Sequence, residues 1–442
     1  MMSMYLWAAA WLLHPTLAIR AVDDVDDEVS VSVDLERHVA WNRPGMVKEP
    51  TMDQLPGPWK DRLSKVRVLG SGSFGTVYQL RATCDATNEE FVSLKLMAKD
   101  RDAYKEVKNM RRMQGAHYVI STVGKPDYVE TPDTMDILMP YLNGGDMHDL
   151  WKKCMKTKGC VSCEKGMCWD QLGPPYSNAY IFALFYQATL GVQEIHSKGF
   201  VHMDIKSENI MLNCIDQKCF AHVIDLGLMG PRGACNLGGT PGYMAPEIWK
   251  VIVSKSGKLW KEIGQGQPQN DVYSLGVVLY ELAHPGKQPP FYSDRAAHRI
   301  STYDPSTDPV LSGPEQSELD RLIISMLNPD HETRIGTAEI LQRLMGYLLT
   351  MPDFTPEIIE MISLTPQAAH GEVPLPKCLW SWHRPLPDIG DQNFTRNACG
   401  DDSTEATEAT SDGGSTAEKV CQCHVLRKGT VVQEEFQAPE CL

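Results

Sequence analysis

A glycine-rich stretch, VRVLGSGSFGTVYQL, is the first part of the sequence whose residue types suit a chemical role. Gly70, Gly72 and Gly75 would let backbone amides approach a phosphate closely, because no side chain intervenes. The stretch lies between two β-branched runs that are typical of strands. A plain hairpin or a dinucleotide loop would share these glycines. A dinucleotide loop leads into a helix, however, whereas TVYQL continues as a strand and places Val77 to cover an adenine.

A buried cation is predicted shortly after this stretch. The run FVSLKL places Lys95 among apolar neighbours in a third strand, where an unpaired ammonium would be costly to bury. The following segment, RDAYKEVKNMRRM, has helical spacing at Val107, Met110 and Met113. Glu106 lies near its start and is the expected counter-ion of Lys95. An exposed Lys95 on an edge strand is the alternative.

The stretch MDILMPYLNGGDM predicts a strand, a break at Pro140 and a helix that opens after two glycines, which indicates a crossing between two lobes. Here the sequence resembles the hinge of the eukaryotic protein kinases. The resemblance implies that Met139 is the gatekeeper and that Pro140 and Leu142 offer a carbonyl and an amide to adenine. Asp146 would reach the ribose. It also implies that one loop and the strand after it hold ATP, through Gly70, Ser71, Gly72, Ser73, Phe74, Gly75 and Val77.

The resemblance extends to HMDIKSENIML, which matches the catalytic loop of the kinases except that Met203 stands where an arginine is usual. It implies that Asp204 orients the substrate hydroxyl and accepts its proton, and that Lys206 neutralises the transferred phosphoryl group. Lys206 is characteristic of the serine/threonine kinases rather than the tyrosine kinases. Asn209 would be a magnesium ligand.

Further motifs follow in the order that the kinase family has them. Asp225, in HVIDLGLMG, is the second implied magnesium ligand. Thr240 matches the threonine beside the catalytic aspartate, and an Ala-Pro-Glu triplet ends at Glu247. Asp271 is expected to brace the catalytic loop, and Arg334 is the expected partner of Glu247. The resemblance covers roughly residues 60 to 349.

The resemblance implies an α+β, two-lobed protein-kinase fold with a small β-rich N-lobe and a larger helical C-lobe. We expect a kinase domain at 55–349, divided into an N-lobe at 55–141 and a C-lobe at 142–349. The implied cofactors are ATP and Mg²⁺, and the implied partner is a protein with a serine or threonine. A pseudokinase, which binds or regulates without catalysis, is the alternative. The chain keeps every polar residue of the site, which favours an enzyme.

Composition bounds these hypotheses. The chain has 442 residues, of which 42% are hydrophobic, enough for one large or two medium packed domains. Its formal net charge of −15 argues against a nucleic-acid partner, because such partners need a positive face.

The N-terminus predicts a secretory signal peptide at 1–18. Its apolar run is followed by small residues that suit cleavage after Ala18, and the run is shorter than the ~20 residues needed to cross a bilayer. A buried helix or an uncleaved anchor is the alternative. No other stretch is long and apolar enough for a membrane span, so none is expected in the mature chain. We therefore expect a protein of the secretory pathway, secreted or stored in a secretory organelle, whose partners include host or lumenal proteins.

Thirteen cysteines in such a chain favour disulfides over reduced thiols. A cysteine-rich insert at 152–172 contains four of them, which could instead hold zinc: Cys154, Cys160, Cys163 and Cys168. Cys214 and Cys219 flank a predicted hairpin turn at bridging distance, with two small buried hydrophobes as the alternative.

The two ends of the chain differ in composition from its centre. Residues 19–54 are expected to be an acidic, solvated extension, and 350–442 a cysteine-containing, partly disordered acidic tail. Asn393 begins a glycosylation sequon in that tail.

Within the kinases, the signal peptide, the cysteine-bearing insert and the arginine-free catalytic loop resemble the secreted rhoptry-type kinases of coccidian parasites. Secreted or lumenal kinases of other lineages and a plant-like receptor kinase fragment are the alternatives, because these features can arise independently. The residue at position 203 also bears on regulation. An arginine there pairs with a phosphate on the activation loop in many kinases, and methionine cannot make that pair. The segment from Gly227 to Thr240 contains no Ser, Thr or Tyr before Thr240 itself. The sequence therefore predicts an enzyme that is active without phosphorylation of this loop.

Overall fold

The structure is a computed structural model that describes residues 55, 57–72, 75–82, 91–156, 169, 175–215, 218–234, 238–254, 265–292, 297–314, 316–363, 420–427 and 430–437. The predicted signal peptide, the acidic extension, most of the cysteine-rich insert and the Asn393 sequon lie outside these residues. Residues 1–399 and 400–442 form two separate units.

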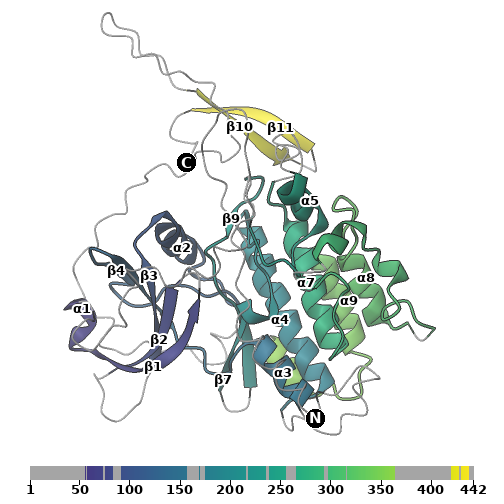
Figure 1. The fold of residues 1–442 in the computed structure, drawn as a ribbon, viewed down its shortest axis with the longest axis horizontal. Helices are drawn as coiled ribbons and strands as arrows, with labels where there is room; N and C mark the ends of the chain where they lie inside the picture. The colour runs from purple at the N-terminus through teal and green to yellow at the C-terminus, as the bar shows by residue number, and fades with distance from the viewer. Residues whose placement is uncertain are drawn as a thin grey trace, which may run out of the picture. The chain divides into compact units, whose positions relative to one another are not determined.

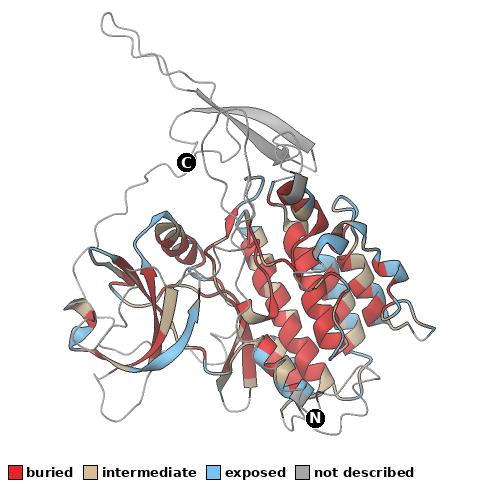
Figure 2. Ribbon diagram, viewed as in Figure 1, coloured by how far each residue is buried: buried red, intermediate tan, exposed pale blue. Residues whose placement is uncertain are grey.

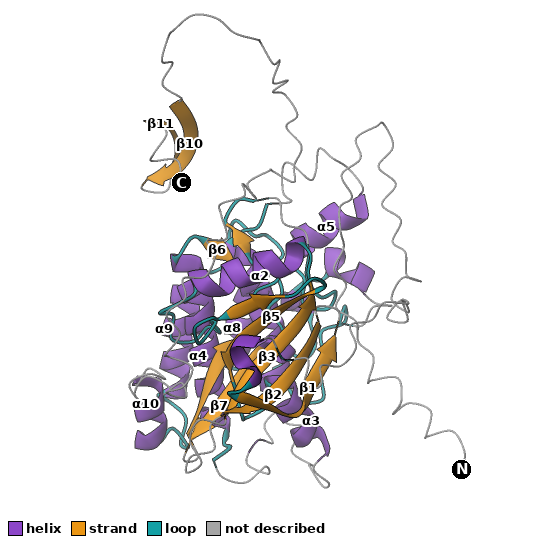
Figure 3. Cartoon of the chain, turned by 90° about the vertical axis from the view of Figure 1, so that its left-hand side faces the viewer, coloured by secondary structure: helices purple, strands orange, loops and turns teal. Residues whose placement is uncertain are grey.

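The N-lobe is built on one antiparallel sheet of five strands in the order β1-β2-β3-β5-β4. This sheet faces the viewer in Figure 3. Its helix α2 (Arg101–Arg112) packs on one face, and the short helix α1 (Gly57–Lys60) contributes Trp59 to the cluster on the other. The strands are β1 (Leu63–Gly72), β2 (Gly75–Ala82), β3 (Phe91–Ala98), β4 (Tyr128–Glu130) and β5 (Thr134–Pro140).

Alternation along β3 decides which side chains meet α2. Leu94 and Leu96 join the cluster with Trp59, whereas Met97 joins the cluster that contains Val107 of α2. Because successive side chains of a strand point to opposite faces, Lys95 shares the face of Met97. The strand pattern alone therefore turns this lysine toward the helix.

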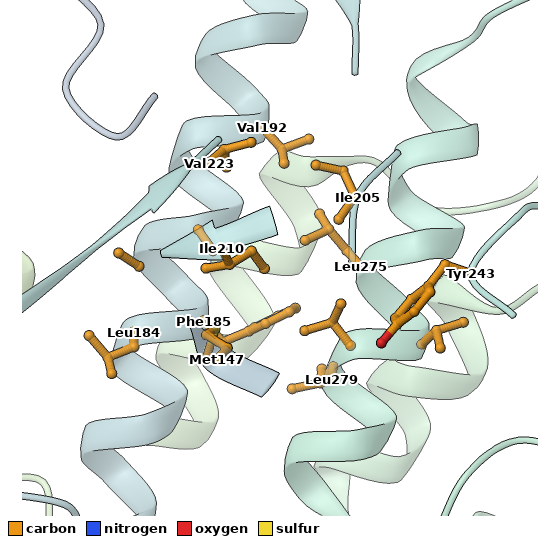
Figure 4. Packing of buried hydrophobic residues seen from close by; sticks show 14 of the residues in the cluster. Met147, Leu184, Phe185, Val192, Ile205, Ile210, Val223, Tyr243, Leu275 and Leu279 are labelled. Atoms are coloured by element: carbon orange, nitrogen blue, oxygen red, sulfur yellow. The ribbon is translucent and has the colours of Figure 1, made fainter. Parts of the chain in front are cut away.

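The C-lobe is organised around two long helices, α4 (Asn178–Ser197) and α7 (Pro268–Ala283), which are buried along most of their length (Figure 2). An apolar sequence all around a helix requires such burial. Ser177 begins α4 by accepting a hydrogen bond from the backbone N–H of Tyr180, and a proline opens α7. Figure 4 shows side chains of α4 and α7, including Phe185 and Leu279, packed in the same core.

The remaining elements surround these helices or connect them (Figure 1). The α-helices are α3 (Met147–Lys156), α5 (Pro246–Ser254), α8 (Glu318–Met326), α9 (Thr337–Leu348) and α10 (Pro356–Ser363). The 3₁₀ helices are η6 (Ser207–Asn209), η7 (Ala297–Thr302) and η8 (Pro305–Thr307). Two short antiparallel pairs complete the lobe, β6 (Phe200–Val201) with β9 (Gly230–Pro231), and β7 (Ile210–Ile215) with β8 (Lys218–Val223).

The predicted α+β fold with two lobes is thereby confirmed. One refinement concerns its end, because α10 packs on α4 and β8 and the side chain of Gln187 donates to the carbonyl of Met361. The folded C-lobe therefore continues to Ser363, past the expected boundary at residue 349.

Three cysteines of the C-lobe form disulfides. Cys214 and Cys219 form a disulfide across the β7–β8 hairpin, as predicted. Cys154, which lies on α3, is also disulfide-bonded, which favours disulfides over zinc in the insert.

The second unit contains a hairpin that the sequence did not predict, in which β10 (Val420–Arg427) pairs with β11 (Thr430–Gln437). No helix among the described residues is long and apolar enough to span a bilayer.

Candidate active site

The glycine-rich stretch forms the turn between β1 and β2. Gly72 lies opposite Gly75 in the register, and Ser73 and Phe74 lie outside the described residues. Gly75 has a φ of +124°, and a Cβ there would lie 2.2 Å from the carbonyl oxygen of Leu96. No other residue type could occupy this position without moving β3. The predicted strands on either side of this stretch are therefore present, with Gly70 and Ser71 on β1 and Val77 on β2, and no helix follows it.

The N-lobe supplies a buried ion pair. Lys95 on β3 contacts Glu106 on α2, with 2.6 Å between Nζ and Oε1, and its Nζ lies 3.5 Å from Oδ1 of Asp225. Burial opposes the charged lysine, but the two carboxylates outweigh it and raise the pKa of Lys95 above its ordinary value. The predicted pairing is confirmed, and the exposed alternative for Lys95, which is 8% exposed, is wrong.

The C-lobe supplies a three-way contact around one carboxylate. Asp204 Oδ2 lies 3.0 Å from Nζ of Lys206, and Oδ1 accepts a 2.7 Å hydrogen bond from the hydroxyl of Thr240. Lys206 also donates to the Thr240 oxygen at 2.9 Å. Burial opposes the charged form of Lys206, but Asp204 and further carboxylates raise its pKa. This arrangement fixes a carboxylate and an ammonium side by side at the point where the sequence implied proton transfer and charge neutralisation.

Asn209 and Asp225 present the oxygen atoms that suit Mg²⁺. The Nδ2 atom of Asn209 donates to the backbone carbonyl of Asp204 at 2.8 Å, which directs the amide oxygen elsewhere. Burial would raise the pKa of Asp225, but Lys95, Lys206 and His202 lower it below its ordinary value. Asp225 is therefore ionised at neutral pH, as a ligand of a divalent cation must be. The two residues fit the metal that the sequence implied.

The catalytic loop is anchored to α7 through its backbone. Both oxygens of the fully buried Asp271 accept backbone N–H groups, Oδ2 from His202 and Oδ1 from Met203, each at 2.8 Å. His196 at the end of α4 contacts Oδ2 as well, at 2.8 Å. Met203 has a φ of +70°, a conformation that is unfavourable for a non-glycine residue. Asp271 therefore stabilises the loop in a backbone shape that its sequence does not favour.

The hinge adds one detail that the sequence did not reveal. Asp146 immediately precedes α3, and its Oδ1 accepts a hydrogen bond from the backbone N–H of Asp149 at 2.7 Å. Burial raises the pKa of Asp146 to about 7 against the opposing effect of that hydrogen bond. The residue implied for ribose binding thus also acts as a helix cap. Met139, Pro140 and Leu142 occupy the end of β5 and the segment after it, as implied.

Some residues that shape the site were missed. The side chain of Asn143 exchanges hydrogen bonds with the backbone of Cys214, at 2.7 and 2.8 Å, and so fixes the segment after the hinge to β7. His196 was missed too, although a histidine in the last turn of a largely apolar helix such as α4 is a usable signal. The expected partnership of Glu247 with Arg334 is confirmed, with Nη1 and Nη2 of the arginine at 2.8 and 3.0 Å from the carboxylate.

Comparison with known proteins agrees with this geometry. The protein kinase domain family matches residues 63–345 of the chain. The chain is 28% identical over 341 residues to the serine/threonine-protein kinase TAO1-B of Xenopus laevis, a match that covers 74% of this chain and 30% of the relative. It is 27% identical over 304 residues to the serine/threonine-protein kinase STE20 of Candida glabrata, covering 65% of this chain and 28% of the relative.

A third relative is the serine/threonine-protein kinase nekl-2 of Caenorhabditis elegans, 26% identical over 236 residues, which cover 50% of this chain and 57% of the relative. The chain therefore spans between 28% and 57% of the lengths of these three relatives. The family match covers most of the described residues, and the Lys95–Glu106 pair and the anchored catalytic loop agree with it. This chain therefore belongs to the protein kinase family.

Proposed function

We propose that this protein transfers the γ-phosphoryl group of ATP to serine or threonine hydroxyls of other proteins. The observation that carries the proposal is the contact of one buried carboxylate, Asp204, with both the Lys206 ammonium and the Thr240 hydroxyl. A structural ion pair would not need the third partner, and the hydrogen bond from Thr240 shows that this carboxylate can accept one from a hydroxyl. Lysine two residues after the aspartate is the form that serine/threonine kinases have.

The residues of the site divide the work of transfer. Asp204 orients the attacking hydroxyl and accepts its proton as the new oxygen–phosphorus bond forms, while the bond from the γ-phosphorus to the bridging oxygen breaks and ADP leaves. Lys206 neutralises charge on the phosphoryl group, while Lys95, held by Glu106, binds the phosphates that remain on the nucleotide. Mg²⁺ bound by Asn209 and Asp225 would neutralise the phosphates of ATP. Positioning and charge neutralisation account for most of the catalysis in such a site.

The enzyme is active as synthesised, without phosphorylation of residues 227–240. Gly266 holds this segment by two backbone hydrogen bonds, since the N–H of Gly233 donates to Gly266 and the N–H of Gly266 donates to Ala234, both at 2.9 Å. A Cβ on Gly266 would lie 3.4 Å from the sulfur of Met203, so this thioether packs closely against the same backbone. Met203, 7% exposed, supports the segment by packing where an arginine would need a phosphate.

The test measures phosphate transfer to a generic basic protein by the purified chain, before and after exhaustive treatment with phosphatase. An unchanged rate supports the proposal. A large loss that returns on incubation with ATP would leave a kinase that needs phosphorylation. Absence of transfer by the untreated chain, with the Asp204→Asn variant as the background control, would instead favour a pseudokinase.

The protein is secreted or stored in a secretory organelle, in the manner of the rhoptry-type kinases, and acts on host or lumenal proteins. The Cys214–Cys219 disulfide and the bonded Cys154 support an oxidising compartment. The chain expressed in a eukaryotic host would be recovered from the medium with Ile19 as its first residue, which N-terminal sequencing detects. Retention of residues 1–18 on a membrane-bound product would contradict secretion.

A further inference from the structure

One amide joins α2 to the beginning of residues 226–240, which we name the activation segment. Asn109 is 1% exposed, and its Nδ2 donates to the carbonyl oxygens of Leu226 and Met229, each at 2.8 Å. We name these two hydrogen bonds the Asn109 bridge. The two carbonyls lie more than a hundred residues away in the sequence, so the bridge connects two elements that local structure does not hold together.

The residue type is informative because, apart from Glu106, the buried neighbours of Asn109 on α2 are apolar. Ala103, Val107 and Met110 are the other fully buried positions of α2 that join the large hydrophobic cluster. Burial of an amide is unfavourable unless its hydrogen bonds are made, and a side-chain amide has two N–H donors. Both donors of Asn109 are used when α2 and the activation segment have this arrangement. Forming both hydrogen bonds therefore favours this arrangement over one in which a donor of Asn109 is buried without an acceptor.

The bridge lies next to the catalytic groups on both sides. Glu106 precedes Asn109 by about one turn of α2, and Asp225 immediately precedes Leu226 in the chain. Both carboxylates contact Lys95. A Cβ added to Gly227 would lie 3.5 Å from a carboxylate oxygen of each, which shows how closely the two acids approach. A shift of α2 relative to the activation segment would therefore separate the groups that hold Lys95.

A second contact supports the same junction. The Nη1 atom of Arg112 donates to the Asn109 oxygen at 3.3 Å, and its guanidinium lies 4.9 Å from the ring centroid of Phe200 on β6. Because β6 pairs with β9 of the activation segment, the end of α2 is linked to the segment at a second point.

We infer that Asn109 is a positioning residue that holds α2 and the activation segment in the catalytic arrangement, in place of the order that a phosphate would supply. This inference rests on the proposed function, since it concerns activity without phosphorylation. It requires the bridge to favour the active arrangement by about tenfold, within the range of coupling that two buried hydrogen bonds provide.

The test compares two variants of the full chain. Asn109→Leu keeps the size of the side chain and removes both donors. Asn109→Asp keeps its shape, has no donor when ionised and regains one when protonated. We expect kcat to fall about tenfold in both at pH 8, and to recover in part at lower pH in the Asp variant alone, relative to the unaltered chain. Asn328→Asp, at a half-buried position after α8, serves as the matched control.

The outcomes separate the inference from the proposed function. If the phosphatase-treated, unaltered chain transfers phosphate and Asn109→Leu is equally active, the inference is wrong and the proposed function stands. If the loss of kcat only follows a loss of folded protein in thermal melts, the role is structural and the inference is also wrong. Asn109→Ala, which keeps helix propensity, replaces the Leu variant in the same assay should the latter not fold. A chain that is inactive before any substitution overturns the proposed function itself.

Discussion

The two sides of the active site are held in place in different ways. On the C-lobe side, the catalytic loop is bound through its backbone to Asp271, which is fully buried within a long helix. On the N-lobe side, the equivalent support is made by side chains that reach across between elements, the Lys95–Glu106 pair and the amide of Asn109. The large hydrophobic cluster includes residues of both sides.

This difference separates the groups that carry out catalysis from the contacts that set how much of the protein is active. Backbone groups held by a buried carboxylate have few alternative positions, so the geometry around Asp204 is part of the folded C-lobe. Side-chain contacts between α2 and distant segments can be lost without unfolding either lobe, which makes them suited to setting how much of the protein is active. The predictions below test this contrast.

The largest expected effect concerns the C-lobe chemistry. Asp204→Asn should lower the rate of phosphate transfer by about 100- to 10,000-fold, because the amide cannot accept the proton of the substrate hydroxyl. Initial rates on a basic protein measure this effect. The melting temperature should fall as well, because Lys206 loses the charge of its buried partner, although Asn can still accept the hydrogen bond from Thr240. Glu318→Gln, on the exposed surface of α8, is the control. A variant that keeps more than a tenth of the normal rate would contradict the assigned role.

Breaking the N-lobe pair should affect stability as well as rate. Lys95→Met leaves Glu106 buried without its cation, and loss of one partner of a buried pair typically costs about 3–5 kcal/mol. Lys95→Met combined with Glu106→Leu removes both charges and should regain most of that stability while remaining inactive. Urea unfolding and transfer assays on the same samples separate the two effects. Equal stability of the single and double variants would show that the pair is not a buried one in solution.

A smaller effect is expected at the anchor of the catalytic loop. Asp271→Asn keeps the shape of the side chain but replaces one accepting oxygen with an NH₂ group, which must then face a backbone N–H or His196. Leaving such a buried donor unsatisfied costs about 1–3 kcal/mol, which a lower urea midpoint would report. Asp330→Asn, in an exposed turn, is the control. An unaltered midpoint would argue that the loop holds its own shape.

The last effect develops only as the pH changes, and it sharpens the contrast between two buried glutamates. Glu106 faces an ammonium, whereas Glu281 accepts a hydrogen bond from the hydroxyl of Tyr243 at 3.0 Å. Burial raises the pKa of Glu281 to about 8, with a further contribution from Glu208. At a pH below the ordinary pKa of a glutamate, Glu281 is protonated in both the folded and the unfolded state. Between that pH and about pH 8, only the folded state binds the proton. Stability should therefore fall as pH rises through this window, by at most about 1.4 kcal/mol per pH unit.

The matched variant is Glu281→Gln, which cannot titrate. Urea unfolding between pH 5 and pH 8 should show a smaller decline of stability in the variant than in the unaltered chain. Parallel pH profiles for the two proteins would mean that Glu281 is ionised in the folded state, and that a cation or solvent reaches it.

Much of the site followed from residue types in order along the chain. The spacing of Asp204, Lys206 and Asn209 is a local property, and so is the alternation that turns Lys95 toward α2. The disulfide between Cys214 and Cys219 was also predictable, because a short hairpin brings its two ends together whatever the rest of the chain does.

The tertiary structure alone decided what lies across from each inward face. Helical periodicity indicates that Asn109 points inward, but not that two carbonyls from a segment more than a hundred residues later meet it. The same holds for α10, whose packing against α4 depends on where the chain returns after α9. The sequence by itself determined which groups could carry out phosphate transfer and the secondary structure that bears them. Their precise separation depends on long-range contacts, because a local pattern specifies the direction of a side chain and the fold supplies its partner.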